Sequence, residues 1–365
     1  MKNIFDFATK ELSQDAFLMW LFENHECENE SVRQCAYGLL NEFSGLNMRV
    51  GDIENLRTYS QYPCKPISGK KKRGKMDVLI RFVYQGEVYL TVIEDKTFSS
   101  QHDNQLLRYN GTLYAEDTMK RFGVTAEHIH KVFYKTDIED ILDKKACQKA
   151  GWKAYFLEDI YTLLHRFIPD GHDTGSDILN DYIAYISSQR TKTIQLPDTP
   201  MKEWQRISLR TFFYQKVMGE LTDPRINGKN LLDVKYYHYL EFQLQYYIPH
   251  TIHRISIGFV MRKQSEGVGI HLYMSDFPKT ENPLDNRGEA RCEQKVEQAV
   301  IKTFVENSDW FTKSSSKGRE TYFTFGKLNR KRQKAFLYEN GPEQLAAAIR
   351  ELLVFFMDVC EKISL

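Results

Sequence analysis

Two strand-like runs joined by Gln85-Gly86 constrain the fold of this chain more than any other feature of its sequence. The runs cover residues 76–83 and 88–96 and are rich in β-branched and aromatic residues. Glycine as the second residue of a two-residue loop is typical of a tight β-hairpin, although Asn or Asp before it would be the stronger choice. Because apolar side chains occupy both faces, we expect central strands of a sheet that is covered on both sides.

The register of this hairpin places two carboxylates face to face. In a hairpin with a two-residue loop, the residue numbers of two directly opposed residues have the same sum as the residue numbers of the two loop residues. Asp77 and Glu94 meet this condition for the loop Gln85-Gly86. Their Cβ atoms are then expected about 5 Å apart. At an effective dielectric constant of about 20, two like charges at that distance repel by about 3 kcal/mol. A fold tolerates this repulsion when the carboxyls share a proton or hold a divalent cation.

A lysine and a third carboxylate accompany this pair. Side chains alternate along a strand, so Lys96 is expected on the face of Glu94, and Asp95 on the opposite face. Two oxygen ligands and a cation at the end of a strand pair can hold Mg²⁺ or Mn²⁺ and position an attacking water. The alternative is a surface hairpin with carboxylate–lysine cross-strand pairs. The apolar neighbours on both faces disfavour it, because buried unpaired charges are costly.

Asp77, the hairpin and Glu94-Asp95-Lys96 together resemble the PD-(D/E)XK nuclease superfamily, which has the restriction-endonuclease-like fold. Met76 stands where the family pattern has proline, the loosest part of the motif. The resemblance implies a mixed sheet flanked by helices and a divalent metal held by Asp77 and Glu94. It also implies the backbone carbonyl of Asp95 as a further ligand, and Lys96 as the group that positions or activates water for phosphodiester cleavage.

A possible helix downstream extends this resemblance. Gln105 and Tyr109 look like the QxxxY element of the branch similar to RecB-type nucleases, and their spacing places them on one helical face. The resemblance implies that they bind substrate phosphate or orient the lysine. The alternative is a helix that packs Leu106 and Tyr109 while Gln105 makes a minor contact. Ser99 or Ser100 is the expected N-cap.

Charged residues on either side of the strands are candidates for the rest of the site. The resemblance implies Glu11, on an N-terminal helix, as a further metal ligand, with Asp15 one turn later as the next candidate. The alternative is a solvated acid that the helix dipole favours. Lys72, Arg73 and Lys75 belong to a basic run directly before the first strand and could contact substrate phosphate. The alternative there is a solvated loop.

The segment Ser187–Glu203 is the expected domain boundary, because it is polar, carries two prolines and lacks apolar periodicity. Helices are expected at 8–24, 31–44, 101–122, 158–167, 176–188, 202–220, 289–306 and 341–362, and further strands at 132–135, 153–157, 233–248, 254–263, 268–275 and 320–326. This pattern predicts an α/β nuclease-like domain over residues 1–190. Residues 191–365 are predicted to form an α+β accessory domain with an antiparallel sheet, for recognition, oligomerisation or regulation.

Composition narrows the class of protein. Hydrophobic residues make up 42% of the 365 residues and charged residues 27%, which permits a large core and excludes wholesale disorder. No apolar run approaches the roughly 18 residues of a membrane span, and the N-terminus lacks the pattern of a secretory signal. The six scattered cysteines form no CxxC pair, so they argue against a disulfide scaffold and suit a cytoplasmic protein.

These observations predict a Mg²⁺- or Mn²⁺-dependent nuclease, with DNA as the substrate by analogy with the family. A homodimer is expected, because cutting both strands with a one-site enzyme requires two copies. A role in bacterial or phage defence is a plausible setting. Two alternatives stay open: a non-catalytic nucleic-acid or protein-binding module that retains the fold, and a nuclease gated by its C-terminal domain.

Overall fold

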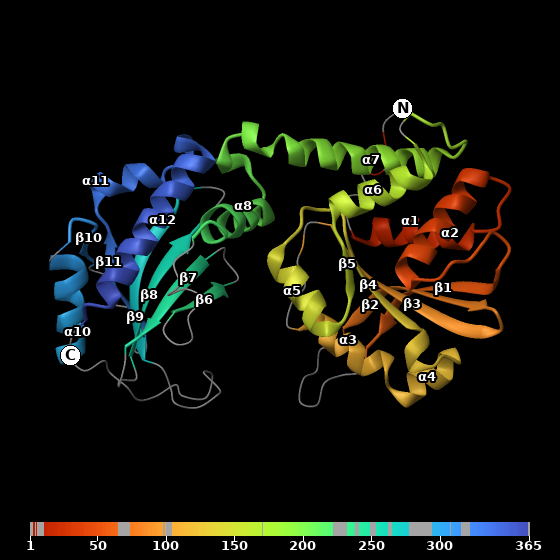
Figure 1. The fold of residues 1–365 in the computed structure, drawn as a ribbon, viewed down its shortest axis with the longest axis horizontal. Helices are drawn as coiled ribbons and strands as arrows, with labels where there is room; N and C mark the ends of the chain where they lie inside the picture. The colour runs from red at the N-terminus through yellow and green to blue at the C-terminus, as the bar shows by residue number, and fades with distance from the viewer. Residues whose placement is uncertain are drawn as a thin grey trace. The chain divides into compact units, whose positions relative to one another are not determined.

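The chain folds as two compact units, Met1–Gln195 and Leu196–Leu365, which we call the N-terminal and C-terminal units (Figure 1). A computed structural model describes residues 3, 5, 11–64, 74–97, 99, 104–169, 171–221, 232–237, 241–248, 253–261, 265–276, 294–306, 308–314 and 322–363. Each unit is considered by itself.

The N-terminal unit is built on a five-stranded mixed sheet with the order β1-β2-β3-β4-β5. Its strands are β1 (Ile53–Pro63), β2 (Lys75–Tyr84), β3 (Glu87–Lys96), β4 (Ile129–Lys135) and β5 (Lys153–Tyr155). The first three strands pair antiparallel, and β3, β4 and β5 pair parallel. This mixed sheet confirms the predicted fold class of the N-terminal half.

The hairpin between β2 and β3 has the predicted register. Gln85 and Gly86 have φ angles of 51° and 80°, the left-handed conformations that a type I′ turn requires. Val78 lies opposite Ile93, as the two-residue loop demands. One residue beyond this pair, Asp77 and Glu94 therefore reach the same end of the sheet.

Helices cover both faces of this sheet, and the alternation of its strands separates two cores (Figure 1). On one face lie α1 (Glu11–Glu23), α2 (Glu30–Ser44), α6 (Leu157–Phe167) and α7 (Asp177–Ile194); on the other lie α3 (Gln105–Leu113), α4 (Glu116–Phe122) and α5 (Ile141–Ala150). Ile93 points into the first core, and its neighbour Val92 points into the second. A short 3₁₀ turn, η2 (Ala126–His128), precedes β4.

Two local expectations for the N-terminal unit were wrong, and one strand was missed. The single helix expected over 101–122 is two helices, because the chain is extended at Ala115 and the acidic first turn of α4 favours a new helix start. Asn104, rather than a serine, precedes the first turn of α3, and Ser100 lies outside the described residues. Strand β1 was not predicted, because most of its side chains are polar and exposed or half-buried.

The C-terminal unit contains a six-stranded antiparallel sheet with the order β10-β11-β9-β8-β7-β6, which confirms the sheet type predicted there. Its strands are β6 (Leu232–Tyr237), β7 (Glu241–Tyr247), β8 (His253–Val260), β9 (Gly269–Asp276), β10 (Phe311–Lys313) and β11 (Tyr322–Leu328). The run expected as one extended segment over 233–248 thus forms two paired strands, β6 and β7.

Helices pack on one face of this second sheet around a single apolar core. They are α8 (Arg206–Phe212), α10 (Gln294–Ile301), α11 (Arg330–Gln333) and α12 (Gly341–Cys360), the π-helical turns η5 (Phe213–Met218) and η6 (Lys302–Glu306), and the 3₁₀ turns η3 (Leu196–Asp198), η4 (Met201–Glu203), η7 (Lys334–Phe336) and η8 (Tyr338–Asn340). In the boundary segment, α7 continues to Ile194, since the first proline stands only at position 197.

Candidate active site

The ends of β2 and β3 bring the predicted carboxylates around one ammonium group. Lys96 Nζ lies 2.5 Å from Glu94 Oε1 and 3.7 Å from Asp77 Oδ2. Glu11 Oε2, from α1, lies 3.9 Å from the same nitrogen. Lys96 Nζ also donates a hydrogen bond to the backbone carbonyl of Asp95 at 2.8 Å. The four groups that the sequence nominated as metal ligands therefore all lie within 4 Å of Lys96 Nζ, each through one oxygen.

Burial and neighbouring charges together shift the pKa values of Glu94 and Lys96. Glu94 is fully buried and Lys96 is 5% exposed. Burial raises the pKa of Glu94 well above its ordinary value; Lys96 opposes this rise, and Asp77 adds to it. Burial acts to lower the pKa of Lys96, but Glu94, Asp77 and Glu11 together hold this pKa above its ordinary value. Lys96 is thus an ammonium ion, suited to donate hydrogen bonds rather than to accept a proton.

Asp95 points to the opposite face of β3, as strand alternation predicts. Its side chain is fully buried, and one oxygen accepts a hydrogen bond from Gln14 Nε2 of α1. Gln14 Oε1 in turn accepts from Thr136 Oγ1 at 2.7 Å. Burial, followed by the charges of Asp15 and Asp77, raises the pKa of the Asp95 carboxyl well above its ordinary value. A glutamine that sequence reasoning missed therefore ties α1 to the end of β3.

Gln61 of β1 connects Asp77 to a further acid. Its Nε2 donates to Asp77 Oδ1 at 3.1 Å and to Asp15 Oδ2 at 3.4 Å. Asp15 is 3% exposed and lies on α1, one turn beyond Glu11. Burial above all, and then the Asp77 charge, raises the pKa of Asp15 from 3.8 to about 7. Gln61 was missed because its strand was missed, whereas the helical spacing of the two α1 acids was a usable signal for Asp15.

The Asp15 carboxyl is expected to make stability depend on pH. Its folded-state pKa is raised, so the folded protein binds an extra proton and loses stability as pH rises from about 4 to about 7. In metal-free buffer, Asp15→Asn should therefore be more stable than wild type above pH 7, by about 1–3 kcal/mol. Urea unfolding across this range measures it. The stability advantage of Asp15→Asn should vanish below pH 4. The control Glu54→Gln, which replaces an exposed acid of β1, should show no such advantage at any pH. An unchanged variant at pH 8 would contradict the prediction.

Gln105 and Tyr109 lie behind the carboxylate rather than in the open. Gln105 Nε2 donates to Glu94 Oε1 and to the Tyr109 hydroxyl, both at 2.6 Å. The Tyr109 hydroxyl donates to the carbonyl of Lys75 at 2.6 Å, and its side chain is 1% exposed. This chain of hydrogen bonds fixes Glu94 against the start of β2. It favours a positioning role for both residues over direct contact of Tyr109 with substrate.

The basic run before β2 is described only at its end. Lys75 is exposed beside Asp77, whereas Lys72 and Arg73 lie outside the described residues. Ser99, which was expected to cap α3, instead donates to Glu11 Oε1 at 2.5 Å. That bond ties the chain after β3 to the first turn of α1.

The next strand adds a second buried lysine beside the site. Lys135 of β4 is the register neighbour of Lys96, and the Thr136 amide donates to the Lys96 carbonyl at 3.0 Å. Lys135 is fully buried, and its Nζ lies 2.7 Å from Asp143 Oδ2 of α5. Sequence reasoning gave no sign of this ion pair, because its partners lie on different elements.

The donor set fits a hard divalent cation in its chemistry. Three carboxylates, those of Glu11, Asp77 and Glu94, lie within 4 Å of Lys96 Nζ. Among the residues that the structure describes, three buried oxygens have no hydrogen-bond partner: Asp15 Oδ1, Glu94 Oε2 and Asp95 Oδ2. A divalent cation would offset this excess of negative charge. Within the described part of the chain, no three His, Cys, Asp or Glu side chains converge at ligand spacing. Lys96 Nζ instead holds the central position between the oxygens.

A mixed sheet with acids and a lysine at the end of its antiparallel pair defines a restriction-endonuclease-like domain. Residues 2–170, slightly less than half of the chain, match the family model described as the PD-(D/E)XK nuclease superfamily. Members are generally nucleases, so a nuclease-type function is supported. No curated protein and no solved structure matches the chain. None of the helices in the described residues could span a membrane.

Proposed function

We propose that the N-terminal unit is a metal-dependent nuclease that hydrolyses phosphodiester bonds in DNA. The observation that supports this most is the convergence of Asp77, Glu94 and Lys96 at one end of the sheet. Asp77, Glu94 and the backbone carbonyl of Asp95 would hold Mg²⁺ or Mn²⁺, with Glu11 as a further ligand. When bound, such an ion polarises the phosphate and lowers the pKa of a coordinated water.

Lys96 has the charge and the surroundings for transition-state stabilisation. Phosphodiester hydrolysis builds negative charge on the phosphoryl oxygens, and a fixed, nearly buried ammonium stabilises that charge more than it would in water. Lys96 already donates to two different acceptors, Glu94 Oε1 and the Asp95 carbonyl. It would redirect this donor capacity to the attacking water or to a phosphate oxygen.

Gln105 would keep Glu94 in position through the reaction. Its amide is fixed between Glu94 and the Tyr109 hydroxyl, so the carboxylate cannot rotate without breaking a buried hydrogen bond. A carboxylate held in this way needs little reorientation to bind a cation, so the free-energy cost of binding is lower. Lys75, with Lys72 and Arg73 before it, would contact substrate phosphates at the edge of the site.

The cellular setting follows from weaker indications. DNA is the proposed substrate by analogy with the superfamily, and a homodimer would let one site per chain cut both strands. The cysteines that the structure describes are all free: Cys27, Cys35, Cys64, Cys147 and Cys360. Free, mostly buried thiols support a reducing cytoplasm as the proposed location.

Metal titration together with DNA cleavage tests the proposed function. In calorimetry with Mg²⁺ or Mn²⁺, Asp77→Asn should weaken binding about tenfold or more, because a neutral amide replaces a charged oxygen ligand. Cleavage of plasmid and linear DNA should fall at least as far. Glu54→Gln removes an exposed acid of β1 and serves as the matched control.

Three results are distinguishable. Loss of both metal binding and cleavage in Asp77→Asn supports the site and its chemistry. Metal binding by the wild type without cleavage points to a nuclease that needs another trigger. A wild type that binds no divalent metal, even with DNA present, would leave only the non-catalytic binding module.

A further inference from the structure

A short segment of the C-terminal unit concentrates positive charge. Residues 327–334, KLNRKRQK, contain five Lys or Arg residues and no Asp or Glu. We call them the basic segment. It starts in β11, forms the short helix α11 and enters the 3₁₀ turn η7. Four of its cations are exposed: Lys327, Arg330, Lys331 and Lys334.

Among the residues that the structure describes, the fifth cation is the one that pairs with another side chain. Arg332 donates to Asp309 Oδ2 at 2.7 Å, and its guanidinium lies 4.4 Å from the ring centroid of Trp310. The Asn329 amide bonds to the Trp310 carbonyl at 2.7 Å, which fixes the start of α11. Among the residues that the structure describes, no acid pairs with the four exposed cations. The segment is therefore held in place, and four of its five cations have no acidic partner within the described part of the chain.

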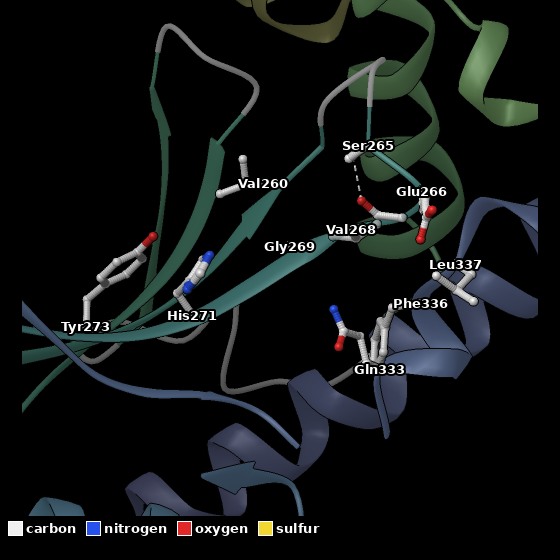
Figure 2. A pocket seen from close by; sticks show the side chains of 11 residues that line it. Val260, Ser265, Glu266, Val268, Gly269, His271, Tyr273, Gln333, Phe336 and Leu337 are labelled. Carbon is white, nitrogen blue, oxygen red and sulfur yellow. Dashed lines mark hydrogen bonds between the residues drawn. The ribbon is translucent and has the colours of Figure 1, made fainter. Parts of the chain in front are cut away.

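A cavity lies on one side of the basic segment. This cavity has a volume of about 440 Å³ and lies between the start of β9 and α11 (Figure 2). Gln333 and Phe336 line it from the α11 side, opposite His271 and Tyr273 of β9. Phe336 is buried, whereas Gln333 lines the cavity and is exposed, as are Arg330, Lys331 and Lys334.

This placement of charge is unfavourable within the segment. Arg330, Lys331 and Arg332 follow one another within the four residues of α11, so their charges lie close together. Lys334 follows Arg330 by four residues and Lys331 by three, spacings at which like charges on a helix repel. A bound polyanion would relieve this repulsion.

We propose that the basic segment is a docking surface for the phosphate backbone of nucleic acid. The inference rests on the proposed function and deepens it: the C-terminal unit would capture the substrate that the N-terminal unit cuts. Clustered Lys and Arg on an exposed surface are the groups that bind successive phosphates. The segment has no exposed large apolar side chain among the described residues, so insertion into a lipid surface is disfavoured. Tethering in one chain would raise the local concentration of substrate.

Binding of duplex DNA by the full chain tests this inference. Fluorescence anisotropy is measured in EDTA, so that the DNA remains intact whether or not the protein is a nuclease. The test variant combines Arg330→Ala, Lys331→Ala and Lys334→Ala. The matched control combines Lys202→Ala, Lys302→Ala and Lys362→Ala, three exposed lysines elsewhere in the same unit.

The test variant should lose affinity about tenfold or more at physiological salt, and the control less than twofold. The slope of log Kd against log salt should fall by about 0.9 for each phosphate contact removed. Lys331→Glu alone should show part of the loss and guards against misfolding of the triple variant. Equal Kd and equal slope for test and control variants would overturn the inference. The inference would also be overturned if the test variant lost binding to anionic phosphatidylserine vesicles but kept its affinity for DNA. That result would identify a membrane as the partner.

Failure of the proposed function gives a different pattern. A wild type that never cleaves DNA but binds it through the basic segment would overturn the nuclease and leave the docking surface standing. Cleavage that survives in the test variant with an unchanged KM for DNA would overturn the docking surface and leave the nuclease standing.

Discussion

Replacing Lys96 by methionine is expected to reduce DNA cleavage by about 10²–10³-fold, the usual cost of removing one preorganised donor from a developing oxyanion. Methionine fills a similar volume but carries no charge, so the loss reports on the ammonium. Binding of Mg²⁺ or Mn²⁺ should persist, because Asp77, Glu94 and the Asp95 carbonyl remain. The measurement pairs single-turnover cleavage with calorimetry on the same samples.

The matched control for this variant is Lys149→Met, which removes an exposed lysine of α5 and should cleave as wild type does. Cleavage by Lys96→Met within threefold of wild type would contradict the proposed role of Lys96. Loss of metal binding together with cleavage would instead indicate that the lysine is needed to assemble the carboxylates. The two readouts thus separate chemistry from architecture.

The largest expected effect on stability lies in the neighbouring strand. Lys135→Met should destabilise the N-terminal unit by about 3–5 kcal/mol, because it removes the ammonium that lies against the fully buried carboxylate of Asp143. Native-state hydrogen exchange of β4 amides in the full chain measures the change locally. Since β4 supports the end of β3, cleavage should fall as well.

A second substitution identifies the cause. Lys135→Met combined with Asp143→Leu removes both charges and should recover much of the lost stability, because a buried ion pair can often be replaced by apolar residues at little cost. Lys144→Met, which breaks an exposed pair between Lys144 of α5 and Glu139 just before that helix, should change stability by less than about 1 kcal/mol. A double variant as unstable as Lys135→Met would refute the electrostatic explanation.

Local rules were sufficient for the central hairpin. The loop Gln85-Gly86 and the alternation of apolar residues determined which residues oppose each other, because a tight turn and a period of two leave one register. The same alternation separated Asp95 from Glu94 and Lys96. The acids and the lysine that carry the resemblance to the superfamily were therefore readable from fewer than thirty residues.

Contacts between distant segments were not readable in this way. Gln61 joins Asp15 and Asp77 from an edge strand whose exposed side chains show no apolar period. Gln14 and Thr136 meet although more than a hundred residues separate them. Each hydrogen bond depends on how α1, β1 and β4 pack, and a single sequence holds no local signal for that packing.

The sequence by itself determined the mixed sheet, the hairpin register and the resemblance of the N-terminal half to a nuclease superfamily, because these follow from short-range periodicity and a compact motif. Only the tertiary structure decided that Gln105 and Tyr109 support Glu94 from behind, and that Lys96 lies centrally among the acids. It also decided that Lys135 is buried beside them. The physical reason is that burial and charge pairing are properties of packed surfaces, which form only when distant elements come together.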